Sequence, residues 1–145
     1  RIDIAQAAAQ QLKEVGIDCT VEVPTEVDWG GQMAYLIGWG SPFDADDHTY
    51  KVFGTDKGAN YSSYSNALVD QYLIEARESA DPEVRAEAYD KFQEELAKDP
   101  AFTFICYIDA NYVANSSIQG ISADTVMGHH GVGIFWNVAD WTIGN

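Results

Sequence analysis

The chain has 145 residues, enough to bury a sizeable core, and its 46% hydrophobic and 21% charged residues are ordinary for a globular protein. Eight Lys and Arg oppose 23 Asp and Glu, which gives a formal net charge of -15. A chain this acidic repels nucleic-acid phosphates and anionic membrane surfaces, so we expect neither as a partner.

A helix followed by a strand is predicted at the N-terminus. Apolar residues recur at helical spacing over residues 3–15, and Gly16 follows as a stop signal. Residues 17–23 alternate strictly between apolar and polar side chains, which is typical of a half-buried strand. This order indicates an α/β unit. Because the chain opens at Arg1 within the helical pattern, we expect an excised segment whose targeting signals lie elsewhere.

A second strand and a forced loop come next. Residues 33–39 have the pattern of a strand, and the run Gly38-Trp-Gly-Ser-Pro42 turns the chain sharply. A short helix is predicted to follow, with Asp44 or Asp46 as its N-cap. Residues 54–65 then form a polar loop rich in glycine, serine and tyrosine.

Two longer helices and an apolar segment complete the pattern. The first helix covers residues 66–78. The second begins at Asp81-Pro82, an N-cap with proline at the first helical position, and ends near Lys98. Residues 101–108 are apolar on both faces, as in a strand buried between two layers, so Phe102 and Phe104 are predicted in the core.

Four stretches of the chain carry a family resemblance, and they cover roughly the first 110 residues. They are Ala7-Ala-Ala-Gln-Gln-Leu-Lys-Glu-Val-Gly-Ile-Asp-Cys-Thr-Val-Glu22, Gly38-Trp-Gly-Ser-Pro-Phe-Asp-Ala-Asp46, Asn60-Tyr-Ser-Ser-Tyr-Ser-Asn66 followed by Asp70, and Asp81-Pro-Glu-Val-Arg-Ala-Glu-Ala-Tyr89 running to Asp99-Pro100. In this order and spacing they resemble the C-terminal lobe of the peptide- and nickel-binding family of solute-binding proteins that serve ABC importers.

The resemblance implies an α/β fold, a periplasmic-binding-protein type II-like lobe with a mixed sheet flanked by helices. Residues 1–110 would form this ligand-binding lobe, and residues 111–145 a tail that returns toward the first lobe of a longer protein. It also implies an extracytoplasmic location, with the membrane reached only through a lipid anchor outside this chain. Residues 28–32 look shorter than the family pattern, which a native or engineered deletion at Gly30-Gly31 would explain.

The implied function is capture, not catalysis. A small peptide or related solute binds between two lobes and passes to ABC permease subunits, and no cofactor is required. A nickel or metal-chelate ligand is the alternative within the family. From other classes, a structural adhesion domain and a glycosidase-like enzyme using Asp44 with Asp46 or Asp47 remain open, although carboxylates so close in sequence rarely oppose one another. No nucleophile-elbow, zincin or phosphate-loop motif is present.

Trp39 is the main ligand-contact candidate. It follows a predicted strand between two glycines, and ligands of open α/β sheets collect at strand ends; packing at a domain corner is the alternative. The resemblance implies that this Trp lines the ligand cavity. Peptide-binding relatives often carry an amine-pairing Asp where Pro42 stands here, so Asp44 and Asp46 are the substitute candidates. The run Trp39-Gly-Ser-Pro-Phe-Asp44 looks closer to the nickel-binding branch of the family. This resemblance implies that Phe43 packs against a chelated metal.

The remaining candidates are tyrosines and histidines. Tyr61 and Tyr64, in the polar loop, could cover a ligand or pack beneath the loop. His48 shares a helical face with Asp44, and His129-His130 lies in a glycine-flanked loop. Imidazole is the commonest ligand of borderline metals such as nickel, although solvated surface histidines are the alternative.

The two cysteines, Cys19 and Cys106, both occur in predicted strands with apolar neighbours. Buried free thiols are therefore expected. A disulfide, which an extracytoplasmic location permits, would require the two strands to be adjacent.

Overall fold

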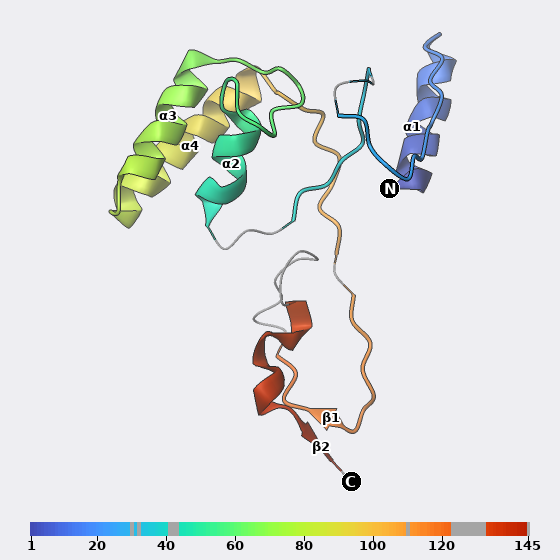
Figure 1. Cartoon of the computed structure of the whole chain (residues 1–145), viewed down its shortest axis with the longest axis vertical. Helices are drawn as coiled ribbons and strands as arrows, with labels where there is room; N and C mark the ends of the chain where they lie inside the picture. Colours follow the sequence, from blue (N-terminus) through green and yellow to red (C-terminus); the bar gives the residue numbers. More distant parts are fainter. Residues whose placement is uncertain (30, 32, 41–43, 110, 123–132, 145) are drawn as a thin grey trace. The chain divides into compact units, whose positions relative to one another are not determined.

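The computed structural model of the chain describes residues 1–29, 31, 33–40, 44–109, 111–122 and 133–144 (Figure 1). They form two compact units, Arg1–Trp39 and Gly40–Asn145. No helix in these ranges is long and apolar enough to cross a membrane.

The first unit begins with helix α1 (Ile2–Glu14), which ends at the predicted glycine stop. Gly16 has a φ of 87°, in the left-handed region that favours glycine. Its N–H donates to the Lys13 carbonyl at 3.1 Å, and the Ile17 N–H donates to the Leu12 carbonyl at 3.0 Å. These two bonds form a Schellman motif, which turns the chain out of the helix.

The two strands predicted in this unit are not paired. Residues 17–23 and 33–39 have no strand partner among the described residues. Tyr35 contacts the residues that follow the first of these segments. Its hydroxyl donates to the Asp28 carbonyl at 2.7 Å, and its ring centroid lies 5.4 Å from that of Trp29. Alternation along a sequence defines two faces, but a strand also needs a neighbouring backbone, and local sequence does not supply one.

Three helices dominate the second unit, and each follows a residue whose side chain accepts a hydrogen bond from a backbone N–H of the first turn. α3 packs against α4, and α2 packs against α3 (Figure 1). The predicted helices, the N-cap at Asp81 and the proline after it are confirmed. The helices and their caps are α2 (Ala45–Phe53) after Asp44, α3 (Ala67–Glu78) after Asn66, and α4 (Pro82–Lys98) after Asp81.

One apolar core holds these helices together. Phe53 of α2 and Phe92 of α4 meet edge to face, with ring centroids 5.4 Å apart. Partly buried aromatic residues, among them Tyr50 and Tyr72, pack against this core. Its buried members are Tyr64, Val69, Leu73, Phe92 and Leu96.

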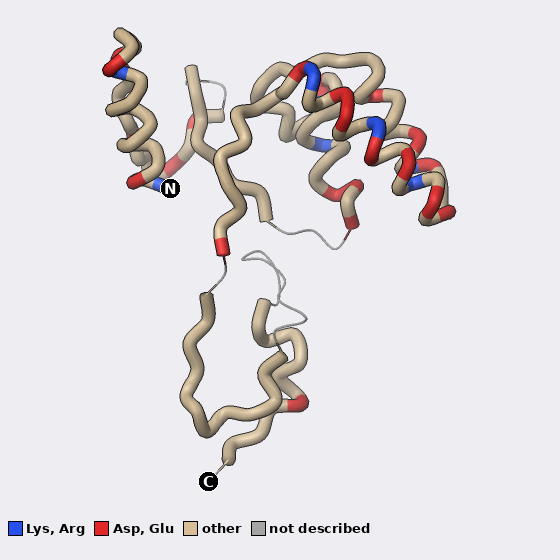
Figure 2. The backbone as a smooth tube through the Cα atoms, turned by 180° about the vertical axis from the view of Figure 1, so that it is seen from behind, with Lys and Arg blue, Asp and Glu red and all other residues tan. Residues whose placement is uncertain are grey.

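The segment at residues 101–108 is extended and mostly exposed, so the prediction of a buried strand is wrong for this chain taken by itself. Phe102 is half-buried, with its ring 5.6 Å from that of Phe53, whereas Phe104 is 66% exposed. The reason is that no second layer of described residues covers the segment. Figure 2 shows that the charged residues of this unit concentrate on its helices, while residues 101–108 carry none.

The tail contains the sheet that the described residues form. Strand β1 (Ile118–Gln119) pairs antiparallel with β2 (Thr142–Ile143), and the 3-10 helix η2 (Gly133–Asp140) precedes β2. Asn137 joins these pieces, because its amide donates to the Gly120 carbonyl at 2.8 Å and its carbonyl accepts from the Trp141 indole at 2.9 Å. The larger mixed sheet that was predicted is not formed by the described residues alone.

Candidate functional site

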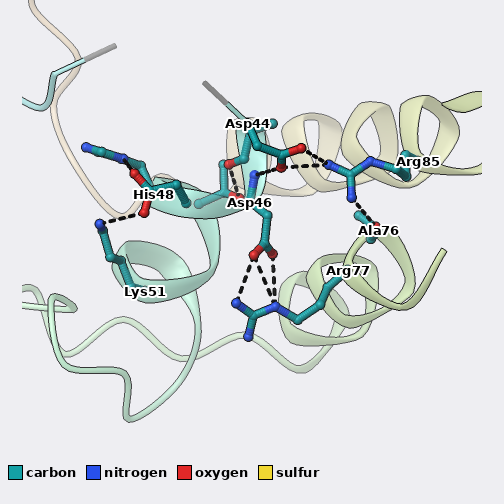
Figure 3. Close-up of polar contacts among 10 residues, drawn as sticks. Asp44, Asp46, His48, Lys51, Ala76, Arg77 and Arg85 are labelled. Carbon is teal, nitrogen blue, oxygen red and sulfur yellow. Dashed lines mark hydrogen bonds and ion pairs between the residues drawn. The ribbon is translucent and has the colours of Figure 1, made fainter. Parts of the chain in front are cut away.

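The predicted ligand residues around the start of α2 have different surroundings. Trp39 is the last residue of the first unit and is 37% exposed. Phe43 lies outside the described residues, so its contact with a ligand stays a prediction. Asp44 and Asp46 are described, and arginines from other helices hold both of them (Figure 3).

Asp44 joins the start of α2 to α4. Its carboxylate accepts the Asp46 backbone N–H at 2.8 Å, which caps the helix. The same carboxylate accepts two hydrogen bonds from Nη2 of Arg85, at 2.7 and 2.8 Å. Arg85 also donates through Nη1 to the Ala76 carbonyl at 3.1 Å, near the end of α3. One guanidinium therefore connects all three helices.

Asp46 makes a second, independent connection to α3. Nε of Arg77 lies 3.1 Å from both carboxylate oxygens, and Nη2 donates to one of them at 2.8 Å. The guanidinium also stacks over the Tyr50 ring, 3.6 Å from its centroid. Such forked contacts fix geometry more than they add stability at a partly exposed site.

We call these four residues, Asp44, Asp46, Arg77 and Arg85, the acid–arginine staple. The sequence pattern predicts both acids as candidate site residues but neither arginine. A signal was available, because the chain has only 8 basic residues against 23 acidic ones. A guanidinium among so many carboxylates is expected to find a partner. Which carboxylate each arginine binds could not be predicted, because the partners lie 31 and 41 residues apart in the sequence.

The staple makes the start of α2 sensitive to acid. The pKa of Asp44 is lowered, first by the backbone N–H of Asp46 and then by Arg85. A carboxyl with a lowered folded-state pKa stabilises the fold above its unfolded pKa of about 3.9, and that contribution is lost as the pH falls through the folded value. We expect Asp44→Asn to reduce the loss of stability between about pH 5 and pH 2, as measured by urea unfolding midpoints. An unchanged pH dependence would contradict this role.

Of the three histidine candidates for a metal ligand, His48 lies in the described part of the chain. Nδ1 of His48 lies 2.9 Å from the Asp47 carboxylate, which also pairs with Lys51 at 3.1 Å. The Asp44 carboxylate, predicted to share a helical face with His48, pairs with Arg85. His129 and His130 lie outside the described residues. Within those residues, no group of three or more His, Cys, Asp or Glu could hold a metal ion.

The two tyrosines of the polar loop differ. Tyr61 is 37% exposed. Tyr64 is 9% exposed and belongs to the core, so its ring packs beneath the loop. Asn60 determines this arrangement: its amide donates to the Gly54 and Tyr64 carbonyls at 3.0 and 2.7 Å, and its oxygen accepts the Tyr64 N–H at 3.0 Å.

We expect Asn60→Ala to lower the free energy of unfolding by about 1.5 kcal/mol, because several backbone groups of the loop lose their partner together. Asn60→Asp is the matched control. It keeps an oxygen that can accept the Tyr64 N–H but places a charged acceptor against the Gly54 and Tyr64 carbonyls, so the loss should be at least as large. Urea unfolding of the three proteins measures this. Equal stability of all three would show that the loop does not depend on Asn60.

Cys19 and Cys106 are both free and exposed, and they lie in separate units. The expectation that their thiols are buried among apolar strand neighbours is therefore wrong. Neither segment has a paired strand among the residues that the structure describes.

Two curated proteins are similar to this chain, whereas no protein-family model matches it. Protein XP55 of Streptomyces lividans is 36% identical over 129 residues, which cover 84% of this chain and 24% of that protein. The oligopeptide-binding protein AppA of Bacillus subtilis (strain 168) is 25% identical over 155 residues, which cover 97% of this chain and 26% of that protein. The chain thus spans about a quarter of the length of these relatives.

Solved structures also resemble the chain, and one of them does so over almost its whole length. The crystal structure of NikZ from Campylobacter jejuni in complex with Ni(L-His) matches with a TM-score of 0.81 and 34% sequence identity. The match covers 98% of this chain and 30% of that chain. It confirms the predicted fold class, an α/β lobe of the periplasmic-binding-protein type.

Proposed function

We propose, from the chain's membership of the peptide- and nickel-binding family of solute-binding proteins, that it forms part of a longer protein that binds a small peptide or related solute for uptake by an ABC importer. The observation that carries the proposal is the likeness, at 34% identity over 98% of the chain, to a protein solved with Ni(L-His). The name of the Bacillus relative supports the peptide class. In this protein residues 1–110 contribute a ligand-binding lobe and residues 111–145 a returning tail.

The proposed mechanism is capture by lobe closure. A ligand that touches both lobes stabilises the closed form by the difference between its affinities for the closed and open forms. The loaded protein then delivers the ligand to ABC permease subunits. This work takes place outside the cytoplasm, and we propose that a lipid anchor outside this chain keeps the protein at the membrane.

Within this lobe, Trp39 is the principal ligand-contact residue that we propose, with Phe43 and Tyr61 as further aromatic contacts. A half-exposed indole has apolar area left to bury against a ligand. The carboxylates of Asp44 and Asp46 are already neutralised by the staple, so a ligand amine would have to displace a guanidinium. We therefore assign the two acids to holding the start of α2 and not to direct ligand contact.

Binding accounts for these residues better than catalysis does. A carboxylate-based glycosidase needs one carboxyl that stays protonated near neutral pH. The pKa of Asp44 is lowered by its backbone hydrogen bond and by Arg85, which is the wrong direction for a general acid. Turnover of any member of a glycan panel would contradict the binding proposal.

The experiment that tests the function is native mass spectrometry of the longer protein as it is purified, followed by calorimetry with the compounds found. A co-purifying peptide that binds in the calorimeter supports the peptide class. An amino-acid complex of nickel supports the second candidate. If the protein carries no ligand and binds neither peptides nor Ni(L-His), the proposal fails.

A nickel chelate is the second candidate because the similar NikZ structure contains Ni(L-His). If the ligand is of this kind, we expect the double substitution His129→Ala, His130→Ala to weaken binding of Ni(L-His) by about tenfold or more, since imidazole coordinates such metals. His48→Ala tests the third histidine candidate separately; its Nδ1 lies against the Asp47 carboxylate, an arrangement that histidines bound to metals also have. Calorimetry measures both. Undiminished affinity of the double variant would remove these histidines from the site.

A further inference from the structure

The loop between α2 and α3 contains a short turn that carries Tyr61 (Figure 1). Asn60, the residue before Tyr61, closes this turn, because the Ser63 N–H donates to the Asn60 carbonyl at 3.4 Å. The Ser62 hydroxyl and the Tyr64 N–H also donate to Oδ1 of Asn60, at 3.1 and 3.0 Å. Tyr61 therefore lies between Asn60 and three residues that all bind Asn60.

The amide group of Asn60 joins the turn to the end of α2. Its Nδ2 donates to the carbonyl of Gly54, the residue that follows α2, at 3.0 Å, and to the Tyr64 carbonyl at 2.7 Å. The Asn60 N–H donates to the Lys57 carbonyl at 3.0 Å. One side chain thus fixes the start of the turn against the helix that precedes it.

The other end of the turn is fixed by burial. The Tyr64 ring is 9% exposed and belongs to the core, so the backbone after the turn cannot move freely. Ser63 has a φ of 54°, a left-handed conformation that residues other than glycine adopt at a cost. Such a conformation persists only where surrounding contacts hold it. We expect the turn to relax when the contacts of Asn60 are removed.

The side chain of Asn60 has no hydrogen-bonding capacity left for a ligand. An amide side chain offers two hydrogens and two lone pairs. In Asn60 the hydrogens go to the Gly54 and Tyr64 carbonyls, and the lone pairs accept the Ser62 hydroxyl and the Tyr64 N–H. Any effect of Asn60 on ligand binding must therefore act through a neighbouring residue, and Tyr61 is the neighbour with exposed aromatic surface.

We propose that Asn60 is a positioning residue for ligand binding, which holds the Tyr61 ring in the orientation that the ligand meets. The inference rests on the proposed function, in which Tyr61 contacts the ligand. A ring that is already held in place loses less conformational entropy when the ligand binds, so the affinity is higher. The affinity should therefore depend on Asn60 only while Tyr61 is present.

A double-mutant cycle in the longer protein tests this dependence. Calorimetry uses the co-purifying compound or, where none co-purifies, trialanine and Ni(L-His). We expect Tyr61→Ala to weaken binding about tenfold and Asn60→Ala about fivefold, since a contact and its positioning residue lose the same interaction. The double variant should be no weaker than Tyr61→Ala alone.

The outcomes separate this proposal from the proposed function. If the two effects multiply to about fiftyfold, or if Asn60→Ala or Tyr61→Ala keeps the original affinity, the positioning role is overturned while ligand binding stands. If the original protein binds none of these compounds, both proposals fail.

Asn66→Ala is the matched control for lost stability. Oδ1 of Asn66 caps α3 by accepting the N–H groups of Leu68 and Val69, at 3.0 and 3.3 Å, and these groups lie outside the turn. Losing this cap destabilises the fold, yet we expect the affinity to stay within about twofold of the original. If Asn66→Ala weakens binding as much as Asn60→Ala does, general destabilisation explains both and the proposal is overturned.

Ser62→Ala provides the same test if Asn60→Ala does not fold, because it removes only one of the bonds to Oδ1 of Asn60. We expect it to weaken binding about threefold when Tyr61 is present and not to change the affinity of Tyr61→Ala. An equal loss in both backgrounds would overturn the positioning role.

Discussion

Replacing Leu73 with alanine is expected to lower the free energy of unfolding by about 3 kcal/mol. Leu73 is 1% exposed and lies in the core between α3 and α4. Its removal leaves a cavity that neighbouring aromatic rings can fill only in part, so the lost burial adds to the cost of the cavity. Urea unfolding measures the effect as a lower midpoint with an unchanged slope.

Ile74 provides the control for this substitution, because it is the next residue on the same helix and is 42% exposed. Ile74→Ala removes a side chain of the same size from the surface and should cost less than about 1 kcal/mol. If both substitutions cost the same, the face of α3 that packs against α4 has been identified wrongly.

Trp39→Ala in the longer protein is expected to weaken ligand binding about thirtyfold, which corresponds to about 2 kcal/mol. The physical reason is that a half-exposed indole can bury a large flat surface when a ligand docks against it. Calorimetry with the ligand identified by mass spectrometry measures the dissociation constant, and thermal unfolding without ligand measures stability. The unfolding temperature should change little.

Trp29 is the matched control for this experiment. It is 45% exposed, lies in the same unit and stacks near Tyr35, so Trp29→Ala removes an indole of similar exposure without a proposed ligand contact. We expect it to keep the original affinity. A Trp39→Ala protein that loses stability but keeps its affinity would show instead that Trp39 is a packing residue.

The helices of this protein could be predicted because their signals are local. Asn66 and Asp81 cap N–H groups only two or three residues further along the chain. At the end of α1, the Gly16 N–H bonds to the carbonyl three residues earlier, and the Ile17 N–H to the carbonyl five residues earlier. Pro82 suits the first turn because its ring fixes φ near the helical value, and because a backbone N–H at that position would have no partner within the helix. None of these features depends on what the distant chain does.

The candidate site was predictable only in part. Trp39 and Tyr61 were identified from motif and composition, and both have exposed surface. Tyr64 lies in the same polar run as Tyr61, yet Asn60 folds the loop so that the Tyr64 ring enters the core. Sequence composition does not distinguish two tyrosines three residues apart, because their difference arises from the path of the loop.

The sequence by itself determined the acidic charge, the helices with their caps and the apolar character of residues 101–108. Only the tertiary structure decided that Asp44 and Asp46 bind Arg85 and Arg77, 41 and 31 residues away, and that residues 17–23 and 101–108 have no strand partner among the described residues. The physical reason is the sequence separation between the residues that each interaction joins. Helical hydrogen bonds close within about four residues, whereas ion pairs between helices and ladders between strands join residues that only the folded chain brings together.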